Sequence, residues 1–251
     1  MRNREADVLS PVKKVSFIVP AYNEECYLAA CLASIRQQRG DFEIVVVDNS
    51  STDRTGDIAR QFADRVVFCP TPGIAAARNC GAQSASSEVL AFVDADARLN
   101  GNWLKQGLER MLTGGFDAVC GWNYFAEDNP LRFSFYNTYS IGFLLFLAAR
   151  SMAGRPVVAG NNLLIRKRTL DAARGFPRFV GEDIKLSSIL NACGCRVGFS
   201  PSMRISYSSR RFRREGFFRV IGLWLESLAR DIPEATYALD YNRQANRSES
   251  I

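Results

Sequence analysis

Histidine is missing from this 251-residue sequence. Without imidazole the chain cannot build a Ser-His-Asp or Cys-His catalytic site, an HExxH zinc site or a histidine-held haem site. A general base must therefore come mainly from aspartate, glutamate, lysine, tyrosine or cysteine. Two glycine-rich nucleotide motifs are also missing. No GxGxxG follows the first apolar run and no GxxxxGK phosphate loop occurs, so dinucleotide and P-loop chemistry are poorly supported.

The sequence also shows no CxxC pair, no recognisable signal peptide and no apolar run of membrane-spanning length. The number of cysteines, seven, is odd, and most lie in apolar stretches, so we expect reduced thiols. Cys193 and Cys195 alone would supply only half of a tetrahedral metal site. The longest apolar run, residues 141–149, is far shorter than the roughly 20 residues that cross a bilayer. We therefore expect a cytoplasmic protein, either free or peripheral on the cytosolic membrane face.

The composition indicates a folded globular protein. Apolar residues make up 47% of the chain and charged residues 23%, which is typical of a globular domain and not of disorder. The formal charge is +6. No recognised nucleic-acid motif accompanies this positive charge, so we expect no nucleic-acid partner.

Short apolar runs alternate with helical patterns along the chain. Strands are predicted over residues 15–19, 43–47, 65–68, 89–93, 117–124, 157–165, 196–200 and 204–208. Helices are predicted over 24–38, 54–63, 74–85, 103–112, 131–150, 184–193 and 212–230. The alternation in the first hundred residues predicts an α/β fold with a Rossmann-like, mostly parallel sheet and helices on both faces.

We expect one compact unit with four parts. They are a mobile N-terminal segment (1–14), a nucleotide-binding half (15–100), an acceptor-binding half (101–240) and a polar tail (241–251).

Polar residues follow three of the predicted strands where each strand ends. These are Tyr22 to Glu24, Asp48, and the pair Asp94 and Asp96. In an open parallel sheet such strand ends meet in a ligand-binding crevice. Because Asp94 and Asp96 are two residues apart, an extended backbone would direct both carboxylates to one side. Such a pair suits Mg²⁺ or Mn²⁺, which also bind phosphate oxygens, although an isolated DxD is a weak signal.

The motifs around these residues resemble family 2 glycosyltransferases of the GT-A fold. The matching stretches are VPAYNE (19–24), VDNSSTDRT (47–55), GIAAARNCG (73–81), VDAD (93–96), Gly160-Asn-Asn, Gly175-Phe176 and Gly181-Glu-Asp183. The resemblance covers roughly residues 14 to 220. It implies an inverting, metal-assisted transfer of a sugar from a nucleotide-diphosphate donor to an acceptor hydroxyl or lipid phosphate.

The resemblance also implies a role for each matching residue. The nucleotide would be contacted by Pro20, Ala21, Tyr22, Glu24, Asp48, Arg78 and Asp94. Asp96 would hold the divalent metal, Mn²⁺ or Mg²⁺, and Asp183 would be the catalytic base. Each role has a structural alternative: Asp48 could cap a helix, Arg78 could be a solvated charge, and Asp183 could belong to an acidic pair at a helix start.

One departure from the family lies after the Glu-Asp pair. Many relatives supply a histidine there, whereas this chain carries Arg210 and Arg211. Guanidinium groups bind phosphate bidentately, so these arginines, with Glu182, are candidates to contact the diphosphate or the acceptor. Their positive charge could replace part of the charge that a metal supplies to the diphosphate. The sequence therefore leaves open whether a metal is needed.

Aromatic residues accompany this basic segment. Five arginines lie between Arg204 and Arg214. The apolar residues beside them are Phe212, Phe217, Phe218, Ile221 and Trp224. The segment is either an interfacial helix on an anionic membrane surface or a core-packing helix with a basic rim. The same two alternatives, a membrane-facing helix or a core-packing helix, apply to residues 133–147.

The resemblance favours UDP over GDP and a glycan or polyprenyl-lipid acceptor. Two other functions remain open from the sequence. A nucleotidyltransferase also uses metal-bound carboxylates, but it normally has a glycine-rich loop where this chain has VPAYNE. The other is a non-catalytic nucleotide-sugar-binding scaffold subunit, and the intact Asp94, Asp96 and Asp183 argue against it.

Overall fold

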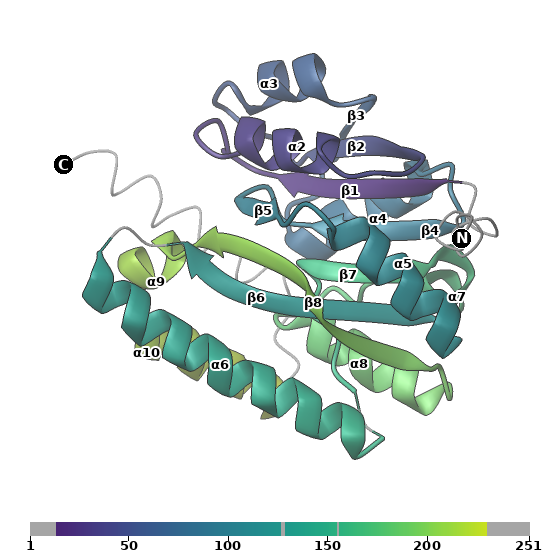
Figure 1. Cartoon of the computed structure of the whole chain (residues 1–251). Coiled ribbons are helices and arrows are strands. Elements are labelled where there is room, and N and C mark those ends of the chain that lie inside the picture. Colours follow the sequence, from purple (N-terminus) through teal and green to yellow (C-terminus); the bar gives the residue numbers. More distant parts are fainter. Residues whose placement is uncertain (1–13, 127–128, 155, 230–251) are drawn as a thin grey trace, which may run out of the picture.

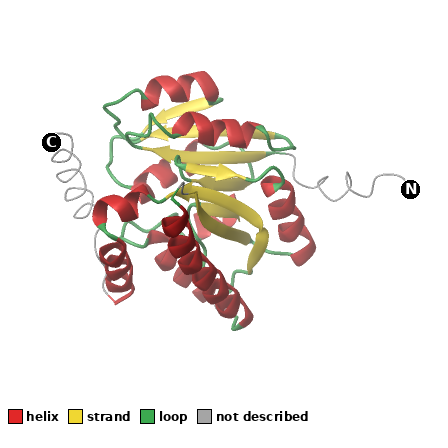
Figure 2. Cartoon of the chain, turned by 60° about the vertical axis from the view of Figure 1, so that its left-hand side comes forward, coloured by secondary structure: helices red, strands yellow, loops and turns green. Residues whose placement is uncertain are grey.

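The structure is a computed structural model that describes residues 14–126, 129–154 and 156–229. Its described residues build one eight-stranded sheet in the order β3-β2-β1-β4-β7-β6-β8-β5, covered by helices on both faces (Figures 1 and 2). The predicted polar tail (241–251), and all but the last residue of the predicted N-terminal segment (1–14), lie outside the described residues.

The first half of the chain forms the parallel part of the sheet. Its strands are β1 (Val15–Ala21), β2 (Phe42–Asp48), β3 (Arg65–Phe68) and β4 (Val89–Val93). The helices between them are α2 (Leu28–Arg36), α3 (Thr55–Phe62) and α4 (Ile74–Ser84). The pairs β1–β2, β1–β4 and β2–β3 are parallel, as the alternating pattern predicts.

The rest of the chain, from β5 on, completes the same sheet. Its strands are β5 (Ala97–Leu99), β6 (Ala118–Ala126), β7 (Asn162–Arg166) and β8 (Val197–Ser208). Its helices are α5 (Trp103–Gly114), α6 (Pro130–Met152), α7 (Lys167–Ala172), α8 (Glu182–Ala192), α9 (Arg210–Glu215) and α10 (Phe217–Ala229). Strand β7 runs antiparallel to both β4 and β6, β5 runs antiparallel to β8, and β6 and β8 are parallel. None of the described helices combines the length and the apolar composition that a bilayer crossing requires.

Several predicted boundaries are wrong in this second half. Strand β7 begins at Asn162 and not at residue 157, because the Asn162 N–H closes a turn onto the Ala159 carbonyl at 3.0 Å. The two predicted strands at 196–208 form the single strand β8. The predicted helix 212–230 is divided at Gly216, whose φ of +86° is a backbone conformation that favours glycine.

Two apolar cores lie on the two sides of the sheet. Trp103 is fully buried in the core that includes α2 and α5, and its Nε1 donates to Asn162 Oδ1 at 2.8 Å. In the other core, α4 packs so closely on the sheet that a Cβ at Gly81 would lie 2.4 Å from Ile18. This close approach fixes α4, and with it Arg78 one helical turn earlier.

A buried carboxylate at the amino end of the sheet gives a stability prediction. Burial alone would raise the pKa of Glu43, but hydrogen bonds from Ser16 and Ser86 outweigh it and lower the pKa to about 2. Glu43 Oε1 accepts from Ser16 Oγ at 2.5 Å and from the Ser86 N–H at 2.9 Å. The stabilisation from a lowered acidic pKa is present above the unfolded value of 4.5 and is lost as the pH falls through about 2.

We expect Glu43→Gln to lower the free energy of unfolding by roughly 1–3 kcal/mol at pH 7, from about 1.4 kcal/mol per pKa unit. The deficit should shrink as the pH is lowered below 4.5. Urea unfolding at pH 7, 5 and 4 measures it, with the exposed Glu109→Gln as the matched control. A deficit that does not change with pH would contradict the assignment.

Candidate active site

Acidic side chains gather at the carboxyl edge of the sheet, as the strand-end pattern predicts. Glu24 follows β1, and Asp94 and Asp96 follow β4. Helix α8 brings Glu182 and Asp183 to the same place from the second half of the chain. Two arginine side chains hold this cluster together, each by contacts to two different carboxylates.

Arg78 joins the two halves of the cluster. Its side chain is only 3% exposed, and Nη2 lies 2.9 Å from Asp94 Oδ1. Nη1 forms an ion pair with Glu182 Oε1, and the guanidinium lies 5.3 Å from the ring centroid of Phe176. A Cβ at Gly160 would lie 2.6 Å from Nη1, so the loop before β7 closes over the arginine. The structure thus places Arg78 in a buried ion-pair network and not on a solvated helix face.

Arg210 makes a second bridge, from α9 to the acidic residues that follow β1 and β4. Its Nη2 forms an ion pair with Glu24 Oε1, and its Nε lies 3.4 Å from Asp96 Oδ2. The guanidinium also lies 4.7 Å from the ring centroid of Tyr27. Arg211, its neighbour in the sequence, lies instead 3.4 Å from Glu215 on the same helix. Of the two arginines predicted to reach the diphosphate, Arg210 contacts the acidic cluster.

Burial sets the protonation of these acids. It raises the pKa of Glu24 to about 7 and that of Asp96 to about 6, with the Arg210 charge opposing both shifts. Burial likewise raises the pKa of Glu182 and Asp183, against the opposing charge of Arg78. Five carboxyl groups therefore face two guanidinium groups, and further positive charge would stabilise their ionised forms.

The donor set fits a divalent metal that takes most of its ligands from the substrate. The described residues contain no group of three side chains able to hold a metal. Mg²⁺-type sites need only one or two carboxylates with waters and substrate phosphates. Asp96 offers such a carboxylate, with a side chain that is 16% exposed. Beside it, Glu24 Oε2 is buried without a hydrogen-bond partner, a polar atom that a bound cation or ligand would satisfy.

Asp183 is held in a fixed orientation at the start of α8. Its Oδ1 accepts from the Ile184 N–H at 2.8 Å, and its Oδ2 accepts from the Gly160 N–H at 3.4 Å. The residue before the helix, Gly181, has a φ of +74°, which aims the Glu-Asp pair inward. A half-buried carboxylate with a raised pKa is the kind of group that accepts a proton from an acceptor hydroxyl.

The remaining predicted residues line the ends of β1 and β2. Pro20 and Ala21 are buried in β1, and Tyr22 is half-buried just after it. Asp48 Oδ1 accepts from the Ser51 N–H at 2.9 Å. Asp48 thus shapes the turn after β2 and does not cap α3, which begins at Thr55 without a side-chain cap.

Sequence reasoning missed two residues that shape this edge. Asn23 has a φ of +53°, and its Oδ1 accepts from the Thr52 N–H at 2.8 Å, which ties the loop after β1 to the loop after β2. Tyr27 supplies the ring against Arg210. The tolerance of asparagine for positive φ was an available signal for Asn23. No local sequence pattern indicated a role for Tyr27.

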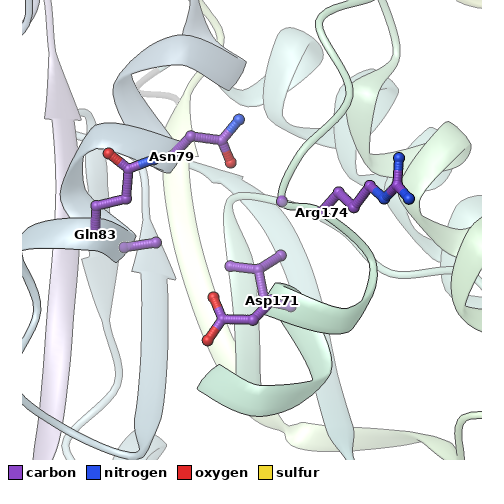
Figure 3. Close-up of a pocket in the computed structure, with 7 residues that line it drawn as sticks. Asn79, Gln83, Asp171 and Arg174 are labelled. Carbon is purple, nitrogen blue, oxygen red and sulfur yellow. The ribbon is translucent and has the colours of Figure 1, made fainter.

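A cavity of about 210 Å³ lies away from this cluster, between α4 and α7. It is lined by Asn79, Ala82, Gln83, Leu170, Asp171, Arg174 and Gly175 (Figure 3). The Arg174 side chain extends away from the labelled amide groups of Asn79 and Gln83 (Figure 3). None of the predicted site residues lines the cavity.

The sheet order and the acidic edge define a GT-A type glycosyltransferase fold, and solved structures share it. The mannosyltransferase PcManGT from Pyrobaculum calidifontis, in complex with GDP-Man and Mn²⁺, aligns with a TM-score of 0.65 at 22% identity, over 89% of this chain and 66% of its own. TarS from S. aureus in complex with UDP-GlcNAc aligns with a TM-score of 0.58 at 23% identity, over 89% of this chain and 69% of its own. These likenesses confirm the predicted fold.

The chain belongs to glycosyl transferase family 2, whose sequence profile matches residues 16–173. Glycosyltransferase AglE of Haloferax volcanii is 28% identical over 213 residues, which cover 79% of this chain and 68% of AglE. Glycosyltransferase GlyA of Streptococcus pneumoniae is 33% identical over 129 residues, which are 49% of this chain but 18% of GlyA. The resemblance drawn from the motifs is thereby confirmed, and with it the assignment as a glycosyltransferase.

Proposed function

We propose that this chain transfers a sugar, with inversion, from a nucleoside-diphosphate donor to an acceptor hydroxyl or lipid phosphate. The observation that carries the proposal is the Arg78 bridge. It joins Asp94 of the predicted donor site to Glu182, the neighbour of the predicted base Asp183. Family membership supplies the reaction class, and the bridge brings the two predicted ends of the reaction to one place.

Each end of the reaction has its own residues in this proposal. Tyr22, Glu24, Asp48 and Asp94 orient the nucleotide. Asp183 takes the proton from the acceptor on the opposite face of the sugar. Arg210 lies against Asp96, where a guanidinium is placed to bind the diphosphate. A Mn²⁺ or Mg²⁺ ion held by Asp96 would supply positive charge for the leaving diphosphate.

We propose UDP as the nucleotide, with GDP as the alternative. One structural neighbour was solved with GDP-Man and Mn²⁺ and another with UDP-GlcNAc, which supports a nucleotide sugar without choosing between the two bases. We propose a glycan or polyprenyl-lipid acceptor and a site of action in the cytoplasm or on the cytosolic membrane face. The nucleotidyltransferase alternative is set aside because the matching family transfers glycosyl groups.

Calorimetric titration with UDP, GDP, dTDP and ADP, each with and without Mn²⁺, tests the donor site. We expect UDP to bind, and to do so only with Mn²⁺. Asp96→Ala should weaken that binding by at least about tenfold, because even outer-shell partners of a metal are typically worth 10–100-fold. The exposed Asp57→Asn on α3 is the matched control and should titrate like the wild type.

Each other result of the titration has a definite meaning. Equal binding with and without Mn²⁺ would exclude the metal role of Asp96 and assign the diphosphate to Arg210. Binding of GDP and of no other nucleotide would replace UDP by GDP in the proposal. Nucleotide binding without donor turnover would favour the scaffold alternative, and no binding to any nucleotide would contradict the donor site itself.

A further inference from the structure

The exposed face of helix α6 is apolar and carries no charge. Its outward residues are Leu131, Ser134, Phe135, Thr138, Ile141, Gly142, Leu145, Phe146, Ala149 and Met152. Leu131, Leu145 and Met152 are 82%, 64% and 90% exposed. At 1.5 Å per residue this face is about 30 Å long. We name these ten residues the α6 face. An ordinary solvated helix exposes charged side chains, as α3 does with Asp57 and Arg60.

Arginines border the α6 face. Arg132 and Arg150 lie near the two ends of α6, and the helix contains no acidic residue. The neighbouring α9 and α10 carry five arginines against Glu215 and Glu226, and the side chain of Glu215 is only 7% exposed. On α10, Phe218 is 82% exposed beside the exposed Arg219. Apolar residues bordered by cationic ones are typical of a surface that lies on anionic lipid.

The two groups of helices form one surface, because α10 packs beside α6. The Phe217 ring lies 5.0 Å from Phe135 and 5.2 Å from Tyr139 by ring centroids. Phe212 and Phe217 thus follow the core-packing alternative drawn from the sequence, whereas Phe218 and the α6 face remain exposed. The side chain of Trp224 lies outside the described residues. Figure 1 shows α6 and α10 along one outer edge of the molecule, away from β3.

A second copy of the chain is a poor occupant for this face. In a two-fold dimer the same patch meets itself. An antiparallel pair of α6 helices would bring Arg132 toward the partner's Arg150, and a parallel pair would bring like ends together. Both arrangements juxtapose like charges, whereas an anionic bilayer complements the arginines at both ends and the net charge of +6.

We infer that the α6 face, with Arg132 and Arg219 at its border, docks this protein on an anionic lipid bilayer as a peripheral membrane surface. Helix α9 connects this surface to the site, since it begins at Arg210, which contacts Glu24 and Asp96. Docking would therefore bring the acidic cluster close to lipid headgroups. The inference rests on the α6 face and goes beyond the proposed reaction, which a glycan acceptor in solution would satisfy equally.

Vesicle flotation without nucleotide tests the docking alone. The full chain should float with phosphatidylglycerol vesicles and much less with phosphatidylcholine vesicles. Leu145→Glu should lower the partition coefficient by about tenfold or more, because it replaces an apolar contact by a negative charge. Arg219→Glu should lower it by at least roughly fivefold on anionic vesicles only. The control is Phe62→Glu on α3, an exposed aromatic at 39% that lies outside the α6 face.

Several outcomes would overturn the inference. One is a wild type that does not float, and another is a Leu145→Glu variant that floats equally well. A wild type that is dimeric without vesicles and becomes monomeric on Leu145→Glu, with no flotation, would assign the face to a second copy. Because Leu145 is exposed, the variant should keep the wild-type unfolding midpoint. Because no donor is present, failure of flotation is distinct from failure of the glycosyltransferase proposal.

Discussion

Asp183→Asn should lower donor turnover by about 10²–10⁴-fold, the usual contribution of a positioned general base. Donor binding should stay close to the wild-type value, because the substitution removes a proton acceptor and leaves Asp94 and Asp96 in place. The asparagine oxygen can still accept from the Ile184 N–H, which lies 2.8 Å from Asp183 Oδ1, so the start of α8 should hold its shape. The loss should therefore appear in kcat and not in donor affinity.

Nucleotide release from the donor that calorimetry identifies measures this turnover. The matched control is Asp171→Asn, an exposed carboxylate on α7. The wild-type rate should rise with pH as Asp183 ionises, and burial moves that rise above the usual aspartate range because it raises the pKa. Undiminished turnover in Asp183→Asn would rule out the base assignment.

Arg78→Met should lower the free energy of unfolding by about 3–5 kcal/mol, the usual cost of removing one partner from a buried ion pair. The guanidinium is 3% exposed and neutralises both Asp94 and Glu182. Methionine fills part of the volume but leaves two carboxylates without their cation. Arg78→Lys should recover only part of the loss, because one ammonium cannot reproduce the two-armed contact.

Urea unfolding measures this loss, and its pH dependence identifies the cause. Burial raises the pKa of Glu182 while Arg78 opposes the shift, so without Arg78 the pKa should rise further. The deficit of Arg78→Met should then be largest at high pH and shrink as acid protonates Glu182. The control is Arg36→Met, whose partner Asp64 is largely exposed, with an expected cost of up to about 1 kcal/mol. Equal stabilities for Arg78→Met and the wild type would mean that the bridge does not hold the site together.

The strands β1 to β4 could be predicted because their signals are local. Each is a short apolar run, three of them are followed by polar residues, and the carboxyl ends of adjacent parallel strands share an edge. The strand-end pattern alone therefore predicts that Glu24, Asp94 and Asp96 lie at one edge of the sheet. Strand β5, by contrast, has only three residues, too few for a recognisable pattern.

The second half of the site depends on contacts that no local pattern records. Arg78 and Glu182 are 104 residues apart, and Arg210 and Glu24 are 186 apart. From the sequence, an arginine on an alanine-rich helix is interpreted as a solvated charge. In the structure, the loop at Gly160 covers this arginine. The motifs therefore predict which residues belong to the site. They do not predict that Arg78 and Arg210 connect its carboxylates.

The single sheet limits how this protein can open and close. Strands β4 and β7 pair along five residues, from Val89 against Arg166 to Val93 against Asn162, and this ladder joins the two halves of the chain. A hinge between the halves would break backbone hydrogen bonds in the middle of the sheet. Access to the acidic cluster is then left to the loops at the carboxyl edge of the sheet and to the Arg210 side chain, which contacts Glu24 and Asp96. The sheet acts as a rigid frame, and Phe212 anchors α9 to it by packing against Phe125.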